Sequence, residues 1–416
     1  MSWDRVNANN GRTRIGVQSA LGTAAGTMVD LVVTAPELPM GKLTRKMIPR
    51  KDQRRYRRDN LAPVKGLKAG APVELMADCK RIATRLATGA SPQAFDDSAP
   101  LSHQILLRAG LGGELDPQPG SAATGTPSTT SVAVTSSHGS RFALGQIVIV
   151  NGHPRRVTGI STDTLTLYPA LASAPSATDA VLNTYCYYPA ENDTLAITVE
   201  HAPTESGTPE LQQRATGVHG ALEITLSVGD VVRYAYKGSA VDWTEPGDLS
   251  ISLATTADDM GAPMVWDPVI YLQSAGTAPS VVQITDLKMT IPRKWQEIPG
   301  PGTQGVSAIA EVASHDAPIT FEIAGHMGTA QWAAFIAQTE RWLMAYTQDG
   351  SGTDQRTVGL YAPRVVFAEP PTAEVNDGLV FFRGKLNALF GTDITATPTP
   401  GTTAETAIAP LLWFLG

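Results

Sequence analysis

The side chains best suited to chemistry in this sequence form a basic run between residues 42 and 58. Asp52 is the one acidic residue of the run. Guanidinium groups at this density can pair bidentately with carboxylates or phosphates, and a tyrosine among them can stack on a base. Three interpretations stay open: a solvated loop, a clasp on an acidic patch of another subunit, or a nucleic-acid contact. The run consists of Lys42, Arg45, Lys46, Arg50, Lys51, Arg54, Arg55, Tyr56, Arg57 and Arg58.

Catalytic and metal-binding patterns do not stand out in the rest of the sequence. There is no HExxH, GxSxG or P-loop spacing, and no GxGxxG ahead of a helix pattern. The seven histidines occur singly, without the spacing of metal ligands. The pairs His315-Asp316 and Asp258-Asp259 lie in turn-like sequence, where solvated side chains are expected. We therefore predict that the protein is not an enzyme and has no catalytic residues, no metal and no cofactor.

The charge of the chain is unevenly distributed. The totals of 32 basic and 39 acidic residues leave 23 basic and 38 acidic residues outside the basic run. An acidic body with one basic arm is suited to self-association. Two cysteines are too few for a disulfide framework, so buried thiols are expected. No apolar signal core or membrane-length segment is present, and we predict no membrane contact and folding in a reducing cytoplasm.

The secondary structure predicted around these residues consists mainly of short strands. The segments 30–36 (DLVVTAP) and 286–292 (DLKMTIP) share four residues and the same alternation. A second strand signal follows each of them, at Ala71-Pro72-Val73 and at Ala317-Pro318-Ile319. A short helix is then predicted in each half, over about 101–110 and about 330–343, and strand hairpins close both halves. This ordered agreement predicts two copies of one β-rich domain.

The predicted organisation is therefore tandem. Residues 1–24 are expected to form an exposed arm, and the Gly-, Ser- and Thr-rich stretch 114–135 is expected to be a linker or loop. The apolar C-terminus is expected to dock on its own body or on a neighbour, through Leu411, Leu412, Trp413, Phe414 and Leu415. The predicted units are the arm 1–24, a first domain over 25–113 with 190–270, an inserted small β subdomain over 114–189, a second domain over 271–394 and a tail over 395–416.

The order of strand, long loop, strand, helix and hairpin resembles that of the tail tube proteins, or major tail proteins, of long-tailed bacteriophages (siphoviruses). The resemblance covers roughly 25–115 and 190–394, and this chain departs from the simplest members by its doubling and its insertion. It implies two tandem β-sandwich or barrel domains, each with a short helix. In that family, strands of neighbouring subunits join into an inner barrel and single-domain members form six-membered rings. Three copies of a doubled chain would then form a trimeric, pseudo-sixfold ring.

The same resemblance implies a function and a set of partners. It implies a structural protein of the virion tail, assembled in the host cytoplasm, whose stacked rings form a conduit for DNA ejection. The partners would be other copies of the chain, a tape-measure protein and DNA in the lumen, and tail terminator and distal tail proteins at the ends. The long first loop, residues 37–60, would contact the adjacent ring. The lumen candidates are Asp30, Thr34, Asp286, Lys288 and Thr290.

We expect an acidic lumen, because negative charge would repel phosphates and let DNA slide. Two alternatives stay open. The chain could be another tail component, such as a distal hub or adaptor, which shares the fold. In a different class, it could be a carbohydrate-binding or adhesion β module, which would present aromatic side chains on exposed faces.

Overall fold

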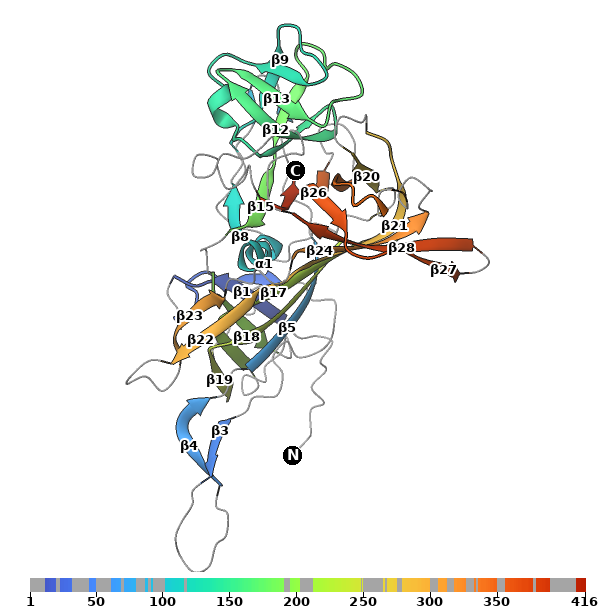
Figure 1. The fold of residues 1–416 in the computed structure, drawn as a ribbon. Coiled ribbons are helices and arrows are strands. Elements are labelled where there is room, and N and C mark those ends of the chain that lie inside the picture. Colours follow the sequence, from blue (N-terminus) through green and yellow to red (C-terminus); the bar gives the residue numbers. More distant parts are fainter. Residues whose placement is uncertain are drawn as a thin grey trace, which may run out of the picture.

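The computed structural model is mainly β (Figure 1). A large antiparallel sheet and a closed six-stranded barrel contain most of the strands, and α1 is the one α-helix labelled among the described residues. No helix in this part of the chain is long and apolar enough to span a membrane. The structure describes residues 12–19, 23–31, 45–49, 61–68, 71–79, 87–88, 91–92, 102–115, 118–190, 195–202, 212–247, 249, 265, 268–274, 279–299, 306–312, 318–326, 333, 336–349, 356–376, 379–389 and 409–416.

The large sheet receives strands from both halves of the sequence. From the first half come β1 (Arg12–Val17), β2 (Val29–Leu31), β5 (Ala71–Asp78), β8 (Gly112–Leu115), β15 (Tyr185–Pro189), β16 (Ile197–Ala202), β17 (Gln212–Ser227), β18 (Arg233–Ala240) and β19 (Asp242–Gly247). From the second half come β20 (Val269–Gln273), β21 (Gln283–Ile291), β24 (Thr320–His326), β25 (Arg341–Asp349), β26 (Arg356–Phe367), β27 (Thr372–Asn376), β28 (Leu379–Ala388) and β29 (Leu412–Leu415).

Three two-stranded sheets lie outside this sheet. The β3–β4 hairpin (Arg45–Pro49 and Leu61–Lys68) flanks part of the basic run and projects from one end of the molecule (Figure 1). The β22–β23 hairpin (Lys294–Pro299 and Val306–Val312) occupies the corresponding place in the second half, between β21 and β24. The third pair is β6–β7 (Ala87–Thr88 and Ser91–Pro92).

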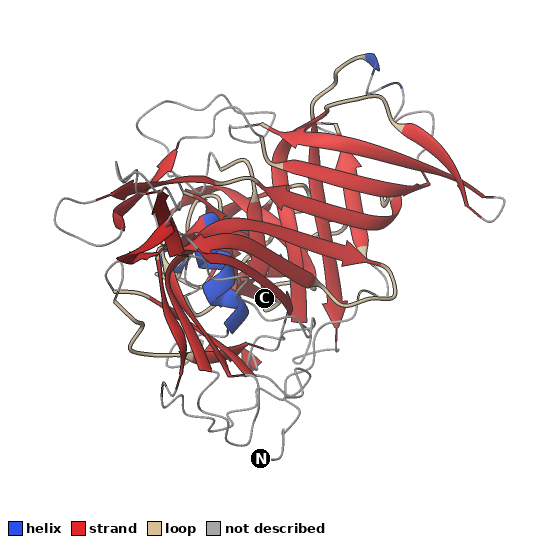
Figure 2. Ribbon diagram, turned by 90° about the horizontal axis from the view of Figure 1, so that it is seen from below, coloured by secondary structure: helices blue, strands red, loops and turns tan. Residues whose placement is uncertain are grey.

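The helix α1 (Ser102–Leu111) confirms the helix predicted over about 101–110. Its side chains from Ile105 to Leu107 are buried, and so are Ala109 and Leu111. A helix that is apolar on nearly every side must be enclosed, and α1 lies among the strands of the large sheet (Figure 2). Arg108 is the partly exposed position, and its Nε lies 2.8 Å from a carboxylate oxygen of Glu114 on β8.

The insertion between β8 and β15 forms a closed barrel with its own apolar core. A turn lies at Asn151-Gly152, and both residues have a positive φ. Contacts on the barrel's outside attach it to the large sheet: Ile147 and Trp342 belong to one buried apolar cluster, and the guanidinium of Arg156 lies 5.5 Å from the ring centre of Tyr361. The barrel strands are β9 (Ser121–Thr124), β10 (Ser131–Val134), β11 (Ile147–Val150), β12 (His153–Ser161), β13 (Thr164–Tyr168) and β14 (Ala180–Asn183), with a 3-10 turn, η2, at Gly139–Arg141.

Two segments predicted to lack regular structure are strands. Residues 12–17 of the predicted exposed arm form β1, which pairs with β16 and β2 and buries Ile15 completely. The predicted linker 114–135 contains β9 and β10, which close the barrel. Both predictions were wrong because the hydrogen-bond partners of these strands come from segments distant in the sequence, which local composition does not reveal.

The second predicted helix, over about 330–343, is also corrected. A helical hydrogen bond joins the Ala337 N–H to the Ala333 carbonyl at 3.0 Å, but β25 already begins at Arg341. Ile336, an apolar residue within the predicted range, is 67% exposed. The run from Trp342 to Tyr346 is buried throughout, as expected for a strand covered on both faces. Such a continuous apolar run also fits a helix pattern, so periodicity alone did not separate the two.

The C-terminal strand β29 lies between β15 and β26 of the same chain, with Leu415 opposite both Tyr185 and Val358. All five residues of the predicted docking segment, Leu411 to Leu415, are completely buried. The described tail therefore docks on its own body. Cys79 and Cys186 are buried and are not part of a disulfide, as predicted.

Candidate functional site

One side of the large sheet presents a continuous polar surface. Six strands lie side by side in the order β5-β18-β17-β21-β24-β28, and β27 follows beyond β28. Side chains alternate between the two faces of a strand. On β5, for example, Val73 and Leu75 are buried, whereas Glu74 and Met76 are exposed. We call the exposed side of these six strands the polar face.

The strand register aligns the side chains of the polar face into rows that cross the sheet. One row runs from Arg233 through Thr225, Lys288 and Glu322 to Lys385. The neighbouring row consists of Met76, Ala235, Glu223, Thr290, Thr320 and Asn387. Residues that are far apart in the sequence are therefore adjacent on this surface.

Opposite charges lie next to each other on the polar face. The Lys288 Nζ is 3.1 Å from an oxygen of Glu223 on the adjacent strand. Glu322 lies opposite Lys288 on one side and opposite Lys385 on the other. Cross-strand pairs of opposite charge stabilise a sheet, whereas like charges destabilise it. The described charged residues of the face are the acidic Glu74, Glu223, Asp286 and Glu322 and the basic Arg233, Lys237, Lys288, Arg383 and Lys385.

The sequence led us to expect an acidic lumen, and whether the polar face is that lumen stays a prediction. The polar face carries three of the five lumen candidates, namely Asp286, Lys288 and Thr290, and its described charges are mixed in sign. The excess of acidic residues in the chain does not specify where they lie. Asp30 is on β2, where its backbone pairs with Arg14, and Thr34 lies outside the described residues.

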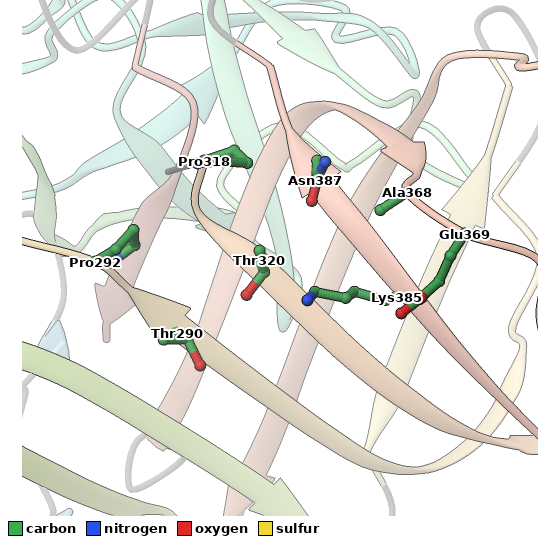
Figure 3. A pocket seen from close by; sticks show the side chains of 8 residues that line it. All are labelled: Thr290, Pro292, Pro318, Thr320, Ala368, Glu369, Lys385 and Asn387. Atoms are coloured by element: carbon green, nitrogen blue, oxygen red, sulfur yellow. The ribbon is translucent and has the colours of Figure 1, made fainter. Parts of the chain in front are cut away.

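A hollow of about 450 Å³ opens on the polar face over β21, β24 and β28 (Figure 3). Thr290, Thr320 and Asn387 belong to one row of the register, and Lys385 is on the next. In Figure 3 the Lys385 ammonium group points toward Thr320, and Glu369 lies on the opposite side of Lys385. The remaining lining residues are Pro292, Pro318 and Ala368.

The polar face is continuous because the two halves of the sequence meet in one antiparallel seam. The seam joins β17 to β21, from Leu222 opposite Ile291 to Ser227 opposite Asp286. Strands of both halves also pair in the same order. The first set is β1-β16-β17-β18-β5 and the second is β20-β25-β26-β28-β24. Corresponding strands occur in the same order along the chain.

The β27–β28 hairpin projects at the far end of this sheet (Figures 1 and 2). Among the described strands, β28 is the one that pairs with β27, so the outer edge of β27 has no described partner. Residues 372–375 are all exposed, and Val375 is 74% exposed. The Arg383–Glu374 ion pair, at 3.3 Å, bridges the two strands of the hairpin.

The predicted clasp residues are described only in part. Arg45 and Lys46 lie on β3, and the backbone of this strand pairs with β4. The other eight residues of the set lie outside the described residues. Sequence reasoning missed Glu223, Glu322 and Lys385 as members of the polar face. The alternation of each strand could place them on a polar side, but only the register across strands brings them together.

Within the described ranges, no group of three or more His, Cys, Asp or Glu side chains is arranged to hold a metal ion. Comparison of the sequence with protein-family models gave no match, and comparison with curated proteins gave none either.

Proposed function

We propose that this chain is a structural protein of a bacteriophage tail tube, in which three copies form a pseudo-sixfold ring and the rings stack. The observation that carries the proposal is the doubled strand order. Each half supplies five strands that pair in one order and follow one order along the chain. Such a repeat within one polypeptide is expected if two equivalent domains occupy successive positions around a ring.

The seam between β17 and β21 indicates how such domains can be joined. There the first half offers the edge of β17, and the second half adds β21 to it through six residue pairs. In the second half, β26 pairs with one part of β28 and β27 pairs with the other part. In the first half, β17 takes the corresponding place beside β18. In the second half, the outer edge of β27 therefore corresponds to the edge of β17 that forms the seam. This edge has no partner among the described residues, and an unpaired strand edge favours strand addition from another chain.

The incoming strand would come from the first half of a neighbouring copy. Segment 286–292, which contributes to β21, is similar in sequence to segment 30–36, whose described part is the end of β2. Six joined domains would close the sheet into a barrel and leave no open edge. The barrel of the insertion lies away from β27 in Figure 1 and does not cover this edge.

A matched pair of variants tests this proposal. The double substitution Ala373→Lys and Val375→Lys places two charges on the exposed hairpin, and edge lysines block strand addition. We expect this variant to fold normally but to stay monomeric, whereas the wild type forms trimers or hollow tubes. Negative-stain images and light scattering measure the assembly. Ile336→Lys, at another exposed apolar position, is the control and should assemble. Wild-type protein that stays monomeric at every salt and protein concentration would exclude the proposed function.

A further inference from the structure

The lysines of the polar face are placed where a phosphate could reach them. Lys385 lies in the hollow together with the hydroxyl groups of Thr290 and Thr320 and the amide of Asn387. All four groups can donate a hydrogen bond to an oxyanion. Lys288 is two strands away in the same row as Lys385 and is partly exposed. The face thus contains the components of a phosphate-binding strip.

Carboxylates occupy the positions beside these lysines. Glu223 contacts Lys288 at 3.1 Å, and Glu322 lies between Lys288 and Lys385 in the register. Glu369 is a further carboxylate at the lining of the hollow. A carboxylate close to an ammonium group cancels most of its field at the distance of an approaching phosphate. A lysine paired in this way neutralises no phosphate, so it releases none of the counterions condensed on the nucleic acid, and that release drives polyanion binding.

We propose that Glu223 and Glu322 keep the polar face from binding polyanions, so that a nucleic acid can pass along it without being held. The inference rests on the proposed function, because a nucleic acid meets this face only if the face lines a conduit. The sequence led us to expect that an acidic surface as a whole repels phosphates. In this proposal, a nearby carboxylate neutralises each lysine instead. The nucleic acid then binds weakly because the lysines are paired with carboxylates, and not because of the net charge of the face.

The test measures how tightly a duplex DNA of about 30 base pairs is bound by the unassembled full-length protein and by its variants. Wild-type protein is expected to bind weakly at about 50 mM salt. The variant Glu223→Gln/Glu322→Gln uncovers two lysines, so its dissociation constant should fall at least about tenfold and its salt dependence should steepen by about two units of log–log slope. Adding Lys288→Gln and Lys385→Gln to this variant should restore weak binding. Thermal unfolding checks that each variant is folded, since an exposed ion pair contributes little to stability.

Glu114→Gln is the matched control. It also removes a carboxylate next to a cation, Arg108, but on the helix side of the sheet, and it should leave DNA binding unchanged. The inference is overturned if the wild type binds as tightly as the double variant, if the folded double variant gains no affinity, or if the control gains as much. Because this measurement uses unassembled protein, absence of tubes would reject the proposed function without altering the binding result.

Discussion

Two adjacent arginines of the barrel, Arg155 and Arg156, are each only 2% exposed. Burial lowers the pKa of Arg155, and its neighbours Tyr271 and Tyr346 act in the opposite direction. The Arg155 Nη1 donates a hydrogen bond to the carbonyl of Pro154 at 2.7 Å. Long side chains of this kind pack through their aliphatic stems as well as their charged ends. The pair therefore belongs to the contact between barrel and sheet.

Replacing Arg156 should show how much this contact contributes to stability. Arg156→Ala removes the guanidinium beside Tyr361 and leaves a cavity, so we expect the free energy of unfolding to fall by about 2–4 kcal/mol. Arg383→Ala, at the exposed ion pair of the β27–β28 hairpin, should change it by less than about 1 kcal/mol. Denaturant titration of both variants measures the difference. Equal, small effects would mean that the barrel is only loosely attached.

His201 should make the protein sensitive to acid. Burial lowers the pKa of His201 to about 4, and its Nδ1 lies 3.1 Å from the Thr13 hydroxyl of β1. The unfolded chain binds the same proton with a pKa near 6.5, so protons favour the unfolded state. Stability from this residue is complete above about pH 6.5 and is lost as the pH falls toward 4, by about 3 kcal/mol.

Denaturant titrations between pH 7 and pH 4 measure this effect. The variant His201→Gln has no proton to bind at this position, so its stability should vary less over the same interval. Parallel pH profiles of wild type and variant would show that another group causes the acid sensitivity.

Among the elements, the C-terminal strand β29 fills the place between β15 and β26 in the sheet. It pairs with β15 on one side and β26 on the other, and Trp413 packs against Tyr234 with ring centres 5.9 Å apart. A terminal segment with this many buried apolar groups is an integral part of the folded unit.

Trp413→Ala should therefore destabilise the whole protein by about 3–5 kcal/mol, which is the usual cost of removing a buried tryptophan. Deletion of residues 411–416 should prevent folding, since the lost burial is comparable with the total stability of a typical domain. Near-ultraviolet circular dichroism and size-exclusion chromatography report both outcomes. A truncated chain with native dichroism would show that β29 is dispensable.

At the scale of the whole molecule, the basic run and the sheet edge would serve different contacts. In the proposed tube, the edge of β27 joins subunits within a ring, whereas residues 37–60 contact the next ring. The β3–β4 hairpin that flanks the run extends from the body in Figure 1, and an extended basic arm can reach an acidic surface of another subunit.

Charge reversal at Arg54, Arg55, Arg57 and Arg58 should separate these two contacts. We expect such a variant to fold and to form single rings, but not to stack them, because the carboxylates of the adjacent ring would repel the new acidic groups. High salt should weaken stacking of the wild type for the same reason. Electron micrographs that show tubes of normal length from this variant would reject the clasp.

Local structure could be predicted wherever the residues that specify it are neighbours in the chain. The helix α1, the strand hairpins that close both halves and the inserted β subdomain were predicted from residues that are neighbours in the chain. The similarity of segments 30–36 and 286–292, together with the order of the elements that follow, also predicted a repeat, and the doubled strand order supports it.

Which strands are neighbours could not be predicted and is known from the folded sheet. In that sheet, β1 lies beside β16, and β29 lies between two strands distant in the sequence. The strands β9 and β10 belong to the closed barrel. The large sheet also brings Glu223, Lys288, Glu322 and Lys385 together on one face. The physical reason is that a strand obtains its hydrogen-bond partners and its cross-strand charges from segments at any distance along the chain, whereas sequence patterns report only the alternation within each strand.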